Sequence, residues 1–132
     1  MRTSEPLILV VDDENSVLGC VREVLRRRGH RCHCCETAED AIEFCRGRHP
    51  DLIISDVHFG GMSGLEMCEH IKVEKGLADI PVMFLSGSQI PDIIRRSHSV
   101  GGAYYLRKPF DPDVLSALVE KALWLTQLVD AP

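Results

Sequence analysis

Three aspartates stand at the ends of two short apolar runs, where they could build a site for a divalent cation. Asp12 and Asp13 follow the run at 7–11, and Asp56 closes the run at 52–56. Two like charges ~4 Å apart repel by about 4 kcal/mol at an effective dielectric of about 20, so three neighbouring carboxylates need a cation or must partly protonate. An incomplete, all-oxygen ligand set suits Mg²⁺, which keeps several waters and leaves room for a phosphate group.

Two further polar side chains follow later apolar runs and could bind that phosphate. Lys108 comes just after the run at 103–106 and could supply a fixed positive charge, and Ser86 follows the run at 80–85 and offers a hydroxyl donor. Each residue type by itself has an ordinary explanation, because aspartates cap helices, serines occur in loops and lysines are usually solvated. Their joint position, at the ends of different apolar runs, favours a shared site.

The apolar runs have the length of buried strands, and helical patterns separate them. Strands that are buried on both faces of a parallel sheet read as unbroken apolar segments. We expect strands at 7–11, 31–35, 52–56, 80–85 and 103–106. Their alternation with helices through short connections predicts an α/β fold, in which a parallel sheet is covered on both faces. The carboxyl ends of the strands then share one edge, where such sheets bind ligands.

Start and stop signals mark the expected helices. Thr37 with Asp40 and Ser63 with Glu66 have the spacing of capping boxes, and Gly29 suits the end of a helix. The helices are expected after Asp13, after Thr37, after Ser63, from Pro91 to Gly101 and after Asp111.

Composition limits the class of protein. With 132 residues, 45% apolar and 27% charged, we expect a single domain that spans residues 1–132, with a core at about 6–128. The net charge of −5 argues against direct binding of nucleic acid. No apolar run approaches the ~20 residues that a membrane span requires. Six cysteines lie mostly inside periodic apolar patterns, and we interpret them as reduced thiols of a cytoplasmic protein.

A set of short motifs accompanies the ends of the expected strands. The motifs are Asp12-Asp13, Asp56, Gly64-Leu65-Glu66, Ser86, Gly101-Gly102-Ala103 and Tyr105-Leu106-Arg107-Lys108-Pro109-Phe110. With them the chain resembles a receiver domain of a two-component response regulator, from about residue 7 to the last helix and without a large insertion. The resemblance implies a flavodoxin-like, doubly wound (βα)5 fold with a five-stranded parallel sheet in the order 2-1-3-4-5.

The resemblance also implies a phosphorylation site that depends on Mg²⁺. Asp56 would accept a phosphoryl group from a phosphohistidine of a sensor histidine kinase or of a phosphotransfer protein. Asp13 and Asp56 would bind Mg²⁺ directly with the backbone carbonyl of His58, and Asp12 would act mainly through a metal-bound water. Such a domain is a signalling switch and no metabolic enzyme, because it catalyses only its own phosphoryl transfer and dephosphorylation.

The same resemblance assigns the residues of the switch. Lys108 would pair with Asp56 and then with the phosphoryl oxygens. Ser86 would move to bind the phosphoryl group, and Tyr105 would swing inward behind it. The result would be a population shift that changes the surface of the fourth helix, the fifth strand and the last helix.

The segment after Asp56 departs from the family pattern. Gly60 stands where a proline is usual, and we interpret Gly60, Gly61 and Gly64 as a flexible loop. This predicts a more mobile metal loop and weaker Mg²⁺ binding than in relatives with a proline. His58 is either a solvated loop side chain or a residue that influences the lifetime of the phosphoryl group.

Two other patterns have less specific explanations. The histidines and cysteines at 30–35 match no standard zinc spacing and fall on an expected strand, so a zinc site is not expected. A second stripe on the last helix contains Trp124 and Leu128. It indicates a surface for a homodimer or an output domain, or else Trp124 is an isolated exposed side chain.

Three other kinds of protein share part of this pattern. A pseudo-receiver would bind proteins without carrying phosphate, but the intact acidic, serine and lysine positions argue against it. A Mg²⁺-dependent phosphatase with an aspartyl phosphate commonly has a second Asp two residues after the nucleophile, where this chain has His58. A flavodoxin-like mononucleotide binder would place a phosphate against acidic groups that repel it.

Overall fold

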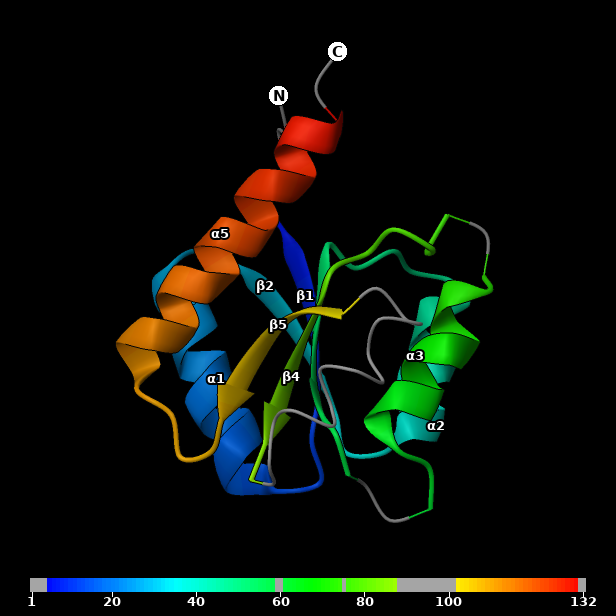
Figure 1. Ribbon diagram of the computed structural model, residues 1–132, viewed down its shortest axis with the longest axis horizontal. Coiled ribbons are helices and arrows are strands. Elements are labelled where there is room, and N and C mark those ends of the chain that lie inside the picture. The colour runs from blue at the N-terminus through cyan, green and yellow to red at the C-terminus, as the bar shows by residue number, and fades with distance from the viewer. Residues whose placement is uncertain (1–4, 59–60, 75, 88–101, 131–132) are drawn as a thin grey trace.

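The computed structural model describes residues 5–58, 61–74, 76–87 and 102–130, and the side chains of all of these except 102–103 and 125–130 (Figure 1). The helix expected between Pro91 and Gly101 lies outside the described residues. Among the helices that are described, none is both long enough and apolar enough to cross a membrane.

In the described part of the chain, five parallel strands form one sheet in the order β2-β1-β3-β4-β5. The strands are β1 (Leu7–Val11), β2 (Arg31–Cys35), β3 (Leu52–Asp56), β4 (Val82–Ser86) and β5 (Gly102–Arg107). Every residue of β1, β3 and β4 is buried, which explains their unbroken apolar sequences. The expected α/β fold and the strand order implied by the resemblance are both confirmed.

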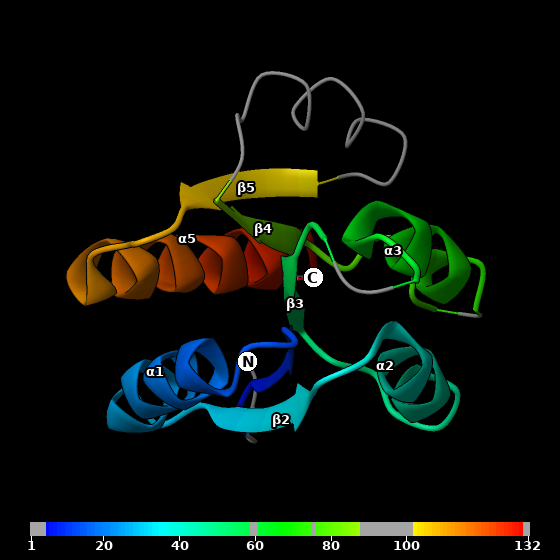
Figure 2. The same cartoon turned by 90° about the horizontal axis from the view of Figure 1, so that it is seen from below.

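Helices cover both faces of this sheet. The described helices are α1 (Asn15–Arg27), α2 (Ala38–Cys45), α3 (Gly64–Lys72) and α5 (Pro112–Asp130). Figure 2 shows α1 and α5 on one side of the strands and α2 and α3 on the other. Because successive strand residues point to opposite faces, Ile8 belongs to the core beneath α1 and α5, and Leu9 belongs to the core beneath α2 and α3.

The expected helix starts are confirmed by hydrogen bonds from the first turn to the capping side chains. Thr37 Oγ1 accepts the Asp40 N–H at 3.1 Å, and Ser63 Oγ accepts the Glu66 N–H at 3.1 Å. Asp111 Oδ1 accepts the N–H of Asp113 at 2.8 Å in the same way. Each bond satisfies an N–H group that the helix itself leaves without a partner.

Helix α1 ends just before Gly29, as the sequence predicts. Gly29 has a φ of 78°, a left-handed conformation that other residues rarely adopt. Its N–H donates to the carbonyl of Arg26, and the next N–H, from His30, donates to the carbonyl of Leu25. This pair of bonds is the Schellman arrangement that closes a helix.

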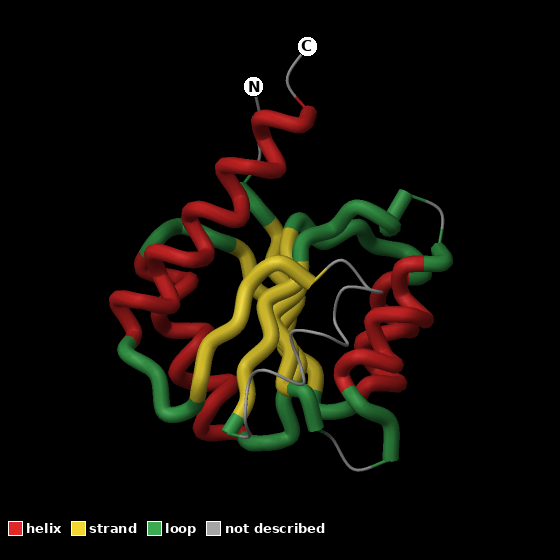
Figure 3. Tube along the Cα trace, viewed as in Figure 1, coloured by secondary structure: helices red, strands yellow, loops and turns green. Residues whose placement is uncertain are grey.

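The limits of two strands differ from the prediction. The fourth strand begins at Val82 and not at residue 80, because Pro81 has no N–H for the ladder, although its carbonyl accepts the N–H of Ile53 at 3.1 Å. It extends to Ser86, and β5 is longer than expected at both ends. Since all the strands are parallel, the carboxyl ends of β1, β3, β4 and β5 reach the same edge of the sheet (Figure 3).

Candidate functional site

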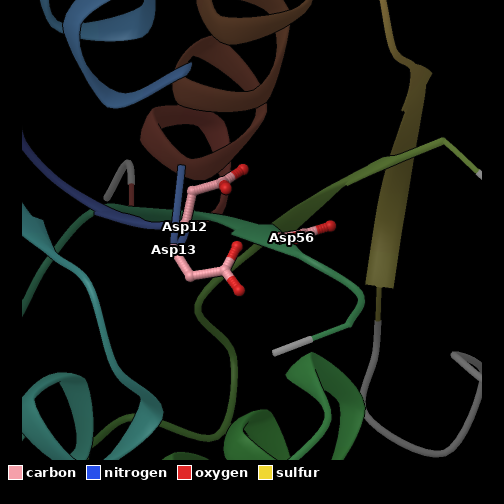
Figure 4. A group of neighbouring side chains, drawn as sticks. All are labelled: Asp12, Asp13 and Asp56. Carbon is pink, nitrogen blue, oxygen red and sulfur yellow. The ribbon is translucent and has the colours of Figure 1, made fainter. Parts of the chain in front are cut away.

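The three aspartates lie together at the carboxyl edge of the sheet. One carboxylate oxygen from each of Asp12, Asp13 and Asp56 lies within 4.8 Å of the others. Figure 4 shows Asp12 and Asp13 leaving the end of β1 and Asp56 leaving the neighbouring β3. Asp12 and Asp56 are buried, and Asp13 is exposed, so the cluster opens to solvent on one side.

Asp12 is held by bonds on both its main chain and its side chain. Its N–H donates to the carbonyl of Cys35 at 3.1 Å, and its Oδ1 accepts the N–H of Glu14 at 2.9 Å. Its Oδ2 lies 2.8 Å from Lys108 Nζ, an ion-pair contact, but within the described residues it accepts no hydrogen bond of regular geometry. This buried oxygen therefore keeps capacity for a further ligand.

Asp56 is oriented by its own loop. Its Oδ1 accepts the N–H of Val57 at 2.8 Å and lies 3.5 Å from Lys108 Nζ. Burial and the nearby Asp12 carboxylate raise the pKa of Asp56, while Lys108 and the N–H groups of Val57 and His58 act in the opposite direction. The site therefore resists the accumulation of negative charge, as expected of a carboxylate cluster that binds a cation.

Gly64 packs directly against the main chain of Asp56. A Cβ at this position would lie 2.1 Å from the Asp56 carbonyl oxygen and 2.9 Å from Ser55 Oγ. The Gly64 N–H donates to the Val57 carbonyl at 2.7 Å, and Ser55 Oγ donates to the Asp56 carbonyl at 2.7 Å. The interpretation of Gly64 as part of a flexible loop is therefore wrong: Gly64 is the buried first residue of α3.

Lys108 lies among three carboxylates. Its Nζ is 2.8 Å from Asp12, 3.5 Å from Asp56 and 3.7 Å from Glu14. Burial lowers the pKa of Lys108, but the three carboxylates outweigh this effect, and the pKa is raised. In this structure the nearest carboxylate to Lys108 is thus Asp12, although the resemblance implies a pair with Asp56.

Ser86 and Tyr105 lie on the two strands next to the cluster. Ser86 is buried at the end of β4, and its carbonyl accepts the N–H of Lys108 at 2.9 Å. Tyr105 on β5 is partly buried, with its ring stacked against Phe84 at 6.2 Å between centroids. Burial raises the pKa of Tyr105. The two residues therefore lie on adjacent strands, and the main chain of Ser86 is bonded to that of Lys108.

Sequence reasoning missed two neighbours of the site. Glu14 contributes a third carboxylate to Lys108, and the buried Ser55 supports the main chain of Asp56. The signals for them were present, because Glu14 directly follows Asp12-Asp13 and Ser55 is a hydroxyl inside an apolar run.

The other residues singled out in the sequence are not part of the acidic cluster, or they lie outside the described residues. His58 has an exposed side chain, and its main chain forms a bridge with Ser63. Gly60 lies outside the described residues, as does the side chain of Leu128. Trp124 is 58% exposed.

In the described part of the chain, the histidines and cysteines at 30–35 do not come together as a group of three or more metal ligands. His30 Nε2 lies 2.7 Å from Glu120 Oε1, and His33 stacks on Phe44 at 4.0 Å between ring centroids. Among the described residues, the side chains that lie close enough together to hold a metal ion are the three aspartates. The expectation that β2 holds no zinc site remains a prediction.

The oxygens of the cluster fit a magnesium ion. The donors are all carboxylates, they do not form a closed cage, and Asp12 Oδ2 has unused capacity. Mg²⁺ prefers such oxygen ligands and completes its octahedron with waters or phosphate oxygens.

Fold and site together define a receiver domain, and comparisons with known proteins agree. Residues 8–120 match the family model for the response regulator receiver domain. Chemotaxis protein CheY4 of Vibrio cholerae superposes with a TM-score of 0.87 and 25% identity, covering 91% of this chain and 100% of that chain. The chain therefore belongs to the response regulator receiver domain family, whose members are signalling domains of two-component systems.

Curated relatives show the same domain within longer proteins. The transcriptional regulatory protein YvrH of Bacillus subtilis is 35% identical over 117 residues, which cover 88% of this chain and 48% of YvrH. The transcriptional regulator NtrC of Escherichia coli is 31% identical over 117 residues, covering 89% of this chain and 24% of NtrC. The chain thus spans about half or less of the length of these relatives.

Proposed function

We propose that this chain is a phosphorylatable receiver domain, in which Asp56 accepts a phosphoryl group from the phosphohistidine of a sensor histidine kinase or a phosphotransfer protein. The observation that carries the proposal is the approach of three carboxylates to within 4.8 Å of one another, with Lys108 beside them. A buried nucleophile, a cation site and a fixed positive charge are the parts that phosphoryl transfer needs.

The acidic cluster would hold the magnesium ion on which the transfer depends. Asp13 and Asp56 would contact Mg²⁺ directly with the main-chain carbonyl of His58, and Asp12 would contact it through a water. When bound, the ion would neutralise the carboxylates and the phosphoryl oxygens, whose charges otherwise repel.

Asp56 would be the nucleophile of the transfer. The N–H of Val57 holds Oδ1 at 2.8 Å, which fixes the carboxylate and leaves Oδ2 to attack phosphorus in line. The new P–O bond forms as the P–N bond of the phosphohistidine breaks, and the electron pair stays on the imidazole nitrogen. Lys108 would then turn from the carboxylates to the phosphoryl oxygens.

The output of the site would be a conformational switch. Ser86 would bind the phosphoryl group, and Tyr105, whose ring stacks on Phe84, would move inward. This would change the surface around β5 and α5. The fourth helix, which the resemblance adds to this surface, lies outside the described residues. Hydrolysis of the aspartyl phosphate by water would reset the switch, and these two reactions are the only ones that the domain would catalyse.

The same proposal includes the extent of the domain, its compartment in the cell and its partners. Residues 1–132 would form one receiver domain with its core at about 6–128. It would work in the cytoplasm, since all six cysteines are free thiols. The face of α5 that exposes Trp124 would bind a second copy of the chain or an output domain.

Incubation with acetyl phosphate and Mg²⁺, followed by intact mass measurement, tests the proposal. We expect a gain of one phosphoryl group that disappears in Asp56→Asn and when the metal is chelated. Asp79→Asn, which changes an exposed turn residue, is the control and should gain the group as the unaltered chain does. If the unaltered chain gains nothing from acetyl phosphate or from a phosphorylated histidine phosphotransfer protein, it is a pseudo-receiver.

A further inference from the structure

Two cysteines face each other on β2, the strand at one edge of the sheet in the described part of the chain. Cys32 and Cys34 lie on β2, the edge strand, and project toward the core beneath α1 and α5. Their Sγ atoms are 3.6 Å apart, and both side chains are only partly buried. The pair is thus reachable from solvent and close enough for the sulfur atoms to react with each other.

A groove at this edge gives access to Cys34. The groove has a volume of about 540 Å³, and its lining includes Cys34, Leu18 and Arg22 of α1, and Phe44 of α2. Arg22 lines the groove together with Cys34, and its guanidinium group lowers the pKa of the Cys34 thiol. The other charged or titratable side chains that line the groove are His33, Cys35, Glu36, Asp40 and Glu43. A small polar reagent can therefore enter the groove and reach the Cys34 thiol beside the Arg22 guanidinium group.

The surroundings make the two thiols chemically different. The contact with the Cys32 sulfur and the Arg22 guanidinium lower the pKa of Cys34 to about 6, although burial acts in the opposite direction. The same sulfur–sulfur contact, together with burial, raises the pKa of Cys32. The two shifts run in opposite directions, so Cys34 is the thiol of the pair that ionises more readily.

The other cysteines lack this combination. Burial raises the pKa of Cys35 and of Cys45 to about 11 and that of Cys68 to about 12. Cys20 is exposed on α1, but no sulfur contact is found for it among the described residues. Among the cysteines, all of which lie in the described residues, only Cys32 and Cys34 have both a close sulfur–sulfur contact and a partly exposed side chain.

We propose that Cys32 and Cys34 form a redox site that a hydroperoxide converts into a reversible disulfide within β2. The Cys34 thiolate attacks one peroxide oxygen: the S–O bond forms, the O–O bond breaks, and the leaving oxygen takes a proton to depart as water or alcohol. The Cys32 sulfur then attacks the sulfenic acid of Cys34 and gives up its proton. The S–S bond forms, and the sulfenic oxygen leaves as water. Two electrons pass from the two sulfurs to the peroxide.

Strand geometry makes this disulfide easy to reduce. Cα atoms two residues apart on a strand are separated by about 6.6 Å, near the upper limit for a disulfide. A disulfide that closes only with a change in the strand is readily opened by thiols, which is typical of regulatory pairs. Because β2 pairs with β1 alone among the described strands, it has room for that change. The site does not depend on the proposed phosphorylation.

Titration of the full, reduced chain with hydrogen peroxide in the presence of a metal chelator tests the proposal. We expect free thiols to fall from six to four, with a loss of two hydrogen atoms in the intact mass and full recovery with dithiothreitol. In Cys32→Ser the reaction should stop at a sulfenic acid on Cys34, which dimedone traps. In Cys34→Ser the peroxide reaction should slow by about tenfold, because the thiolate is gone.

Two further variants separate the chemistry from loss of fold. Cys20→Ser should react as the unaltered chain does, since Cys20 takes no part. Arg22→Gln changes an exposed side chain and should slow the reaction by about threefold with an unchanged circular dichroism spectrum. Equal rates in the unaltered chain, Cys34→Ser and Arg22→Gln would overturn the proposal. So would a disulfide that forms only between chains.

Discussion

The ammonium group of Lys108 lies 2.8 Å from Asp12 Oδ2, although the two residues come from opposite parts of the chain. Asp12 follows β1, and Lys108 follows β5, which lies three places away from β1 in the sheet. A buried carboxylate thus has its charge balanced by a lysine that can also reach Asp56 at 3.5 Å. Binding of a cation to the cluster would compete with this lysine for the same oxygens.

Asp12→Asn should therefore weaken Mg²⁺ binding. We expect the affinity to fall by about tenfold to a hundredfold, the usual cost of losing a residue that supports a metal through a water. Isothermal titration calorimetry measures it, with Asp79→Asn as the control. An unchanged affinity would place Asp12 outside the metal site.

Gly64→Ala should destabilise the fold and disturb Asp56. Its Cβ would lie 2.1 Å from the Asp56 carbonyl oxygen, so the first turn of α3 or the end of β3 must move. We expect a loss of about 1–3 kcal/mol in the free energy of unfolding, measured with urea, together with slower phosphorylation.

Gly19→Ala is the matched control for this change. Gly19 lies inside α1, and a Cβ there would meet no atom within 4 Å. Alanine in a helix interior is favoured over glycine by up to about 1 kcal/mol, so this variant should be slightly more stable and phosphorylated normally. Equal unfolding curves for the two variants would contradict the close packing at Gly64.

Gly60→Pro should strengthen Mg²⁺ binding. A proline at this position restricts the backbone of the chain segment that follows Asp56, so less conformational freedom is lost when the metal binds. We expect a lower Kd by calorimetry. An unchanged or weaker affinity would reject the link between Gly60 and the metal.

The alkylation rate of Cys34 should depend on pH in an unusual way. Because its pKa is lowered to about 6, the thiolate is present above this pH and is lost as the pH falls through it. With iodoacetamide in the Cys20→Ser background, the rate should rise through pH ~6 and then level off, whereas an ordinary cysteine keeps gaining reactivity up to about 8.5. Arg22→Gln should move the midpoint upward, and a midpoint that does not move would exclude a role for Arg22.

Phosphorylation should promote self-association through α5. Trp124 is 58% exposed, and burial of such a side chain commonly dominates the energy of an interface. Sedimentation velocity with and without acetyl phosphate and Mg²⁺ should show a dimer that Trp124→Ala abolishes. A monomer under both conditions would leave the output domain as the partner of this face.

Much of the fold and of the site could be predicted from local sequence, because local physics produces them. Unbroken apolar runs such as Leu52–Asp56 are what strands buried on two faces require, and Thr37, Ser63 and Gly29 act within a few residues of their own helices. The alternation of these elements implies a parallel sheet, and a parallel sheet brings Asp12 and Asp56 to one edge.

Tertiary structure alone decided the contacts between residues that are distant in the chain. The preference of Lys108 for Asp12 over Asp56 depends on the twist and spacing of four strands. The closeness of Gly64 to the Asp56 carbonyl depends on how α3 returns to β3, and local sequence showed there only a residue without a side chain. The sequence pattern thus determines which side chains reach the carboxyl edge of the sheet. Tertiary packing determines which of these side chains contact one another.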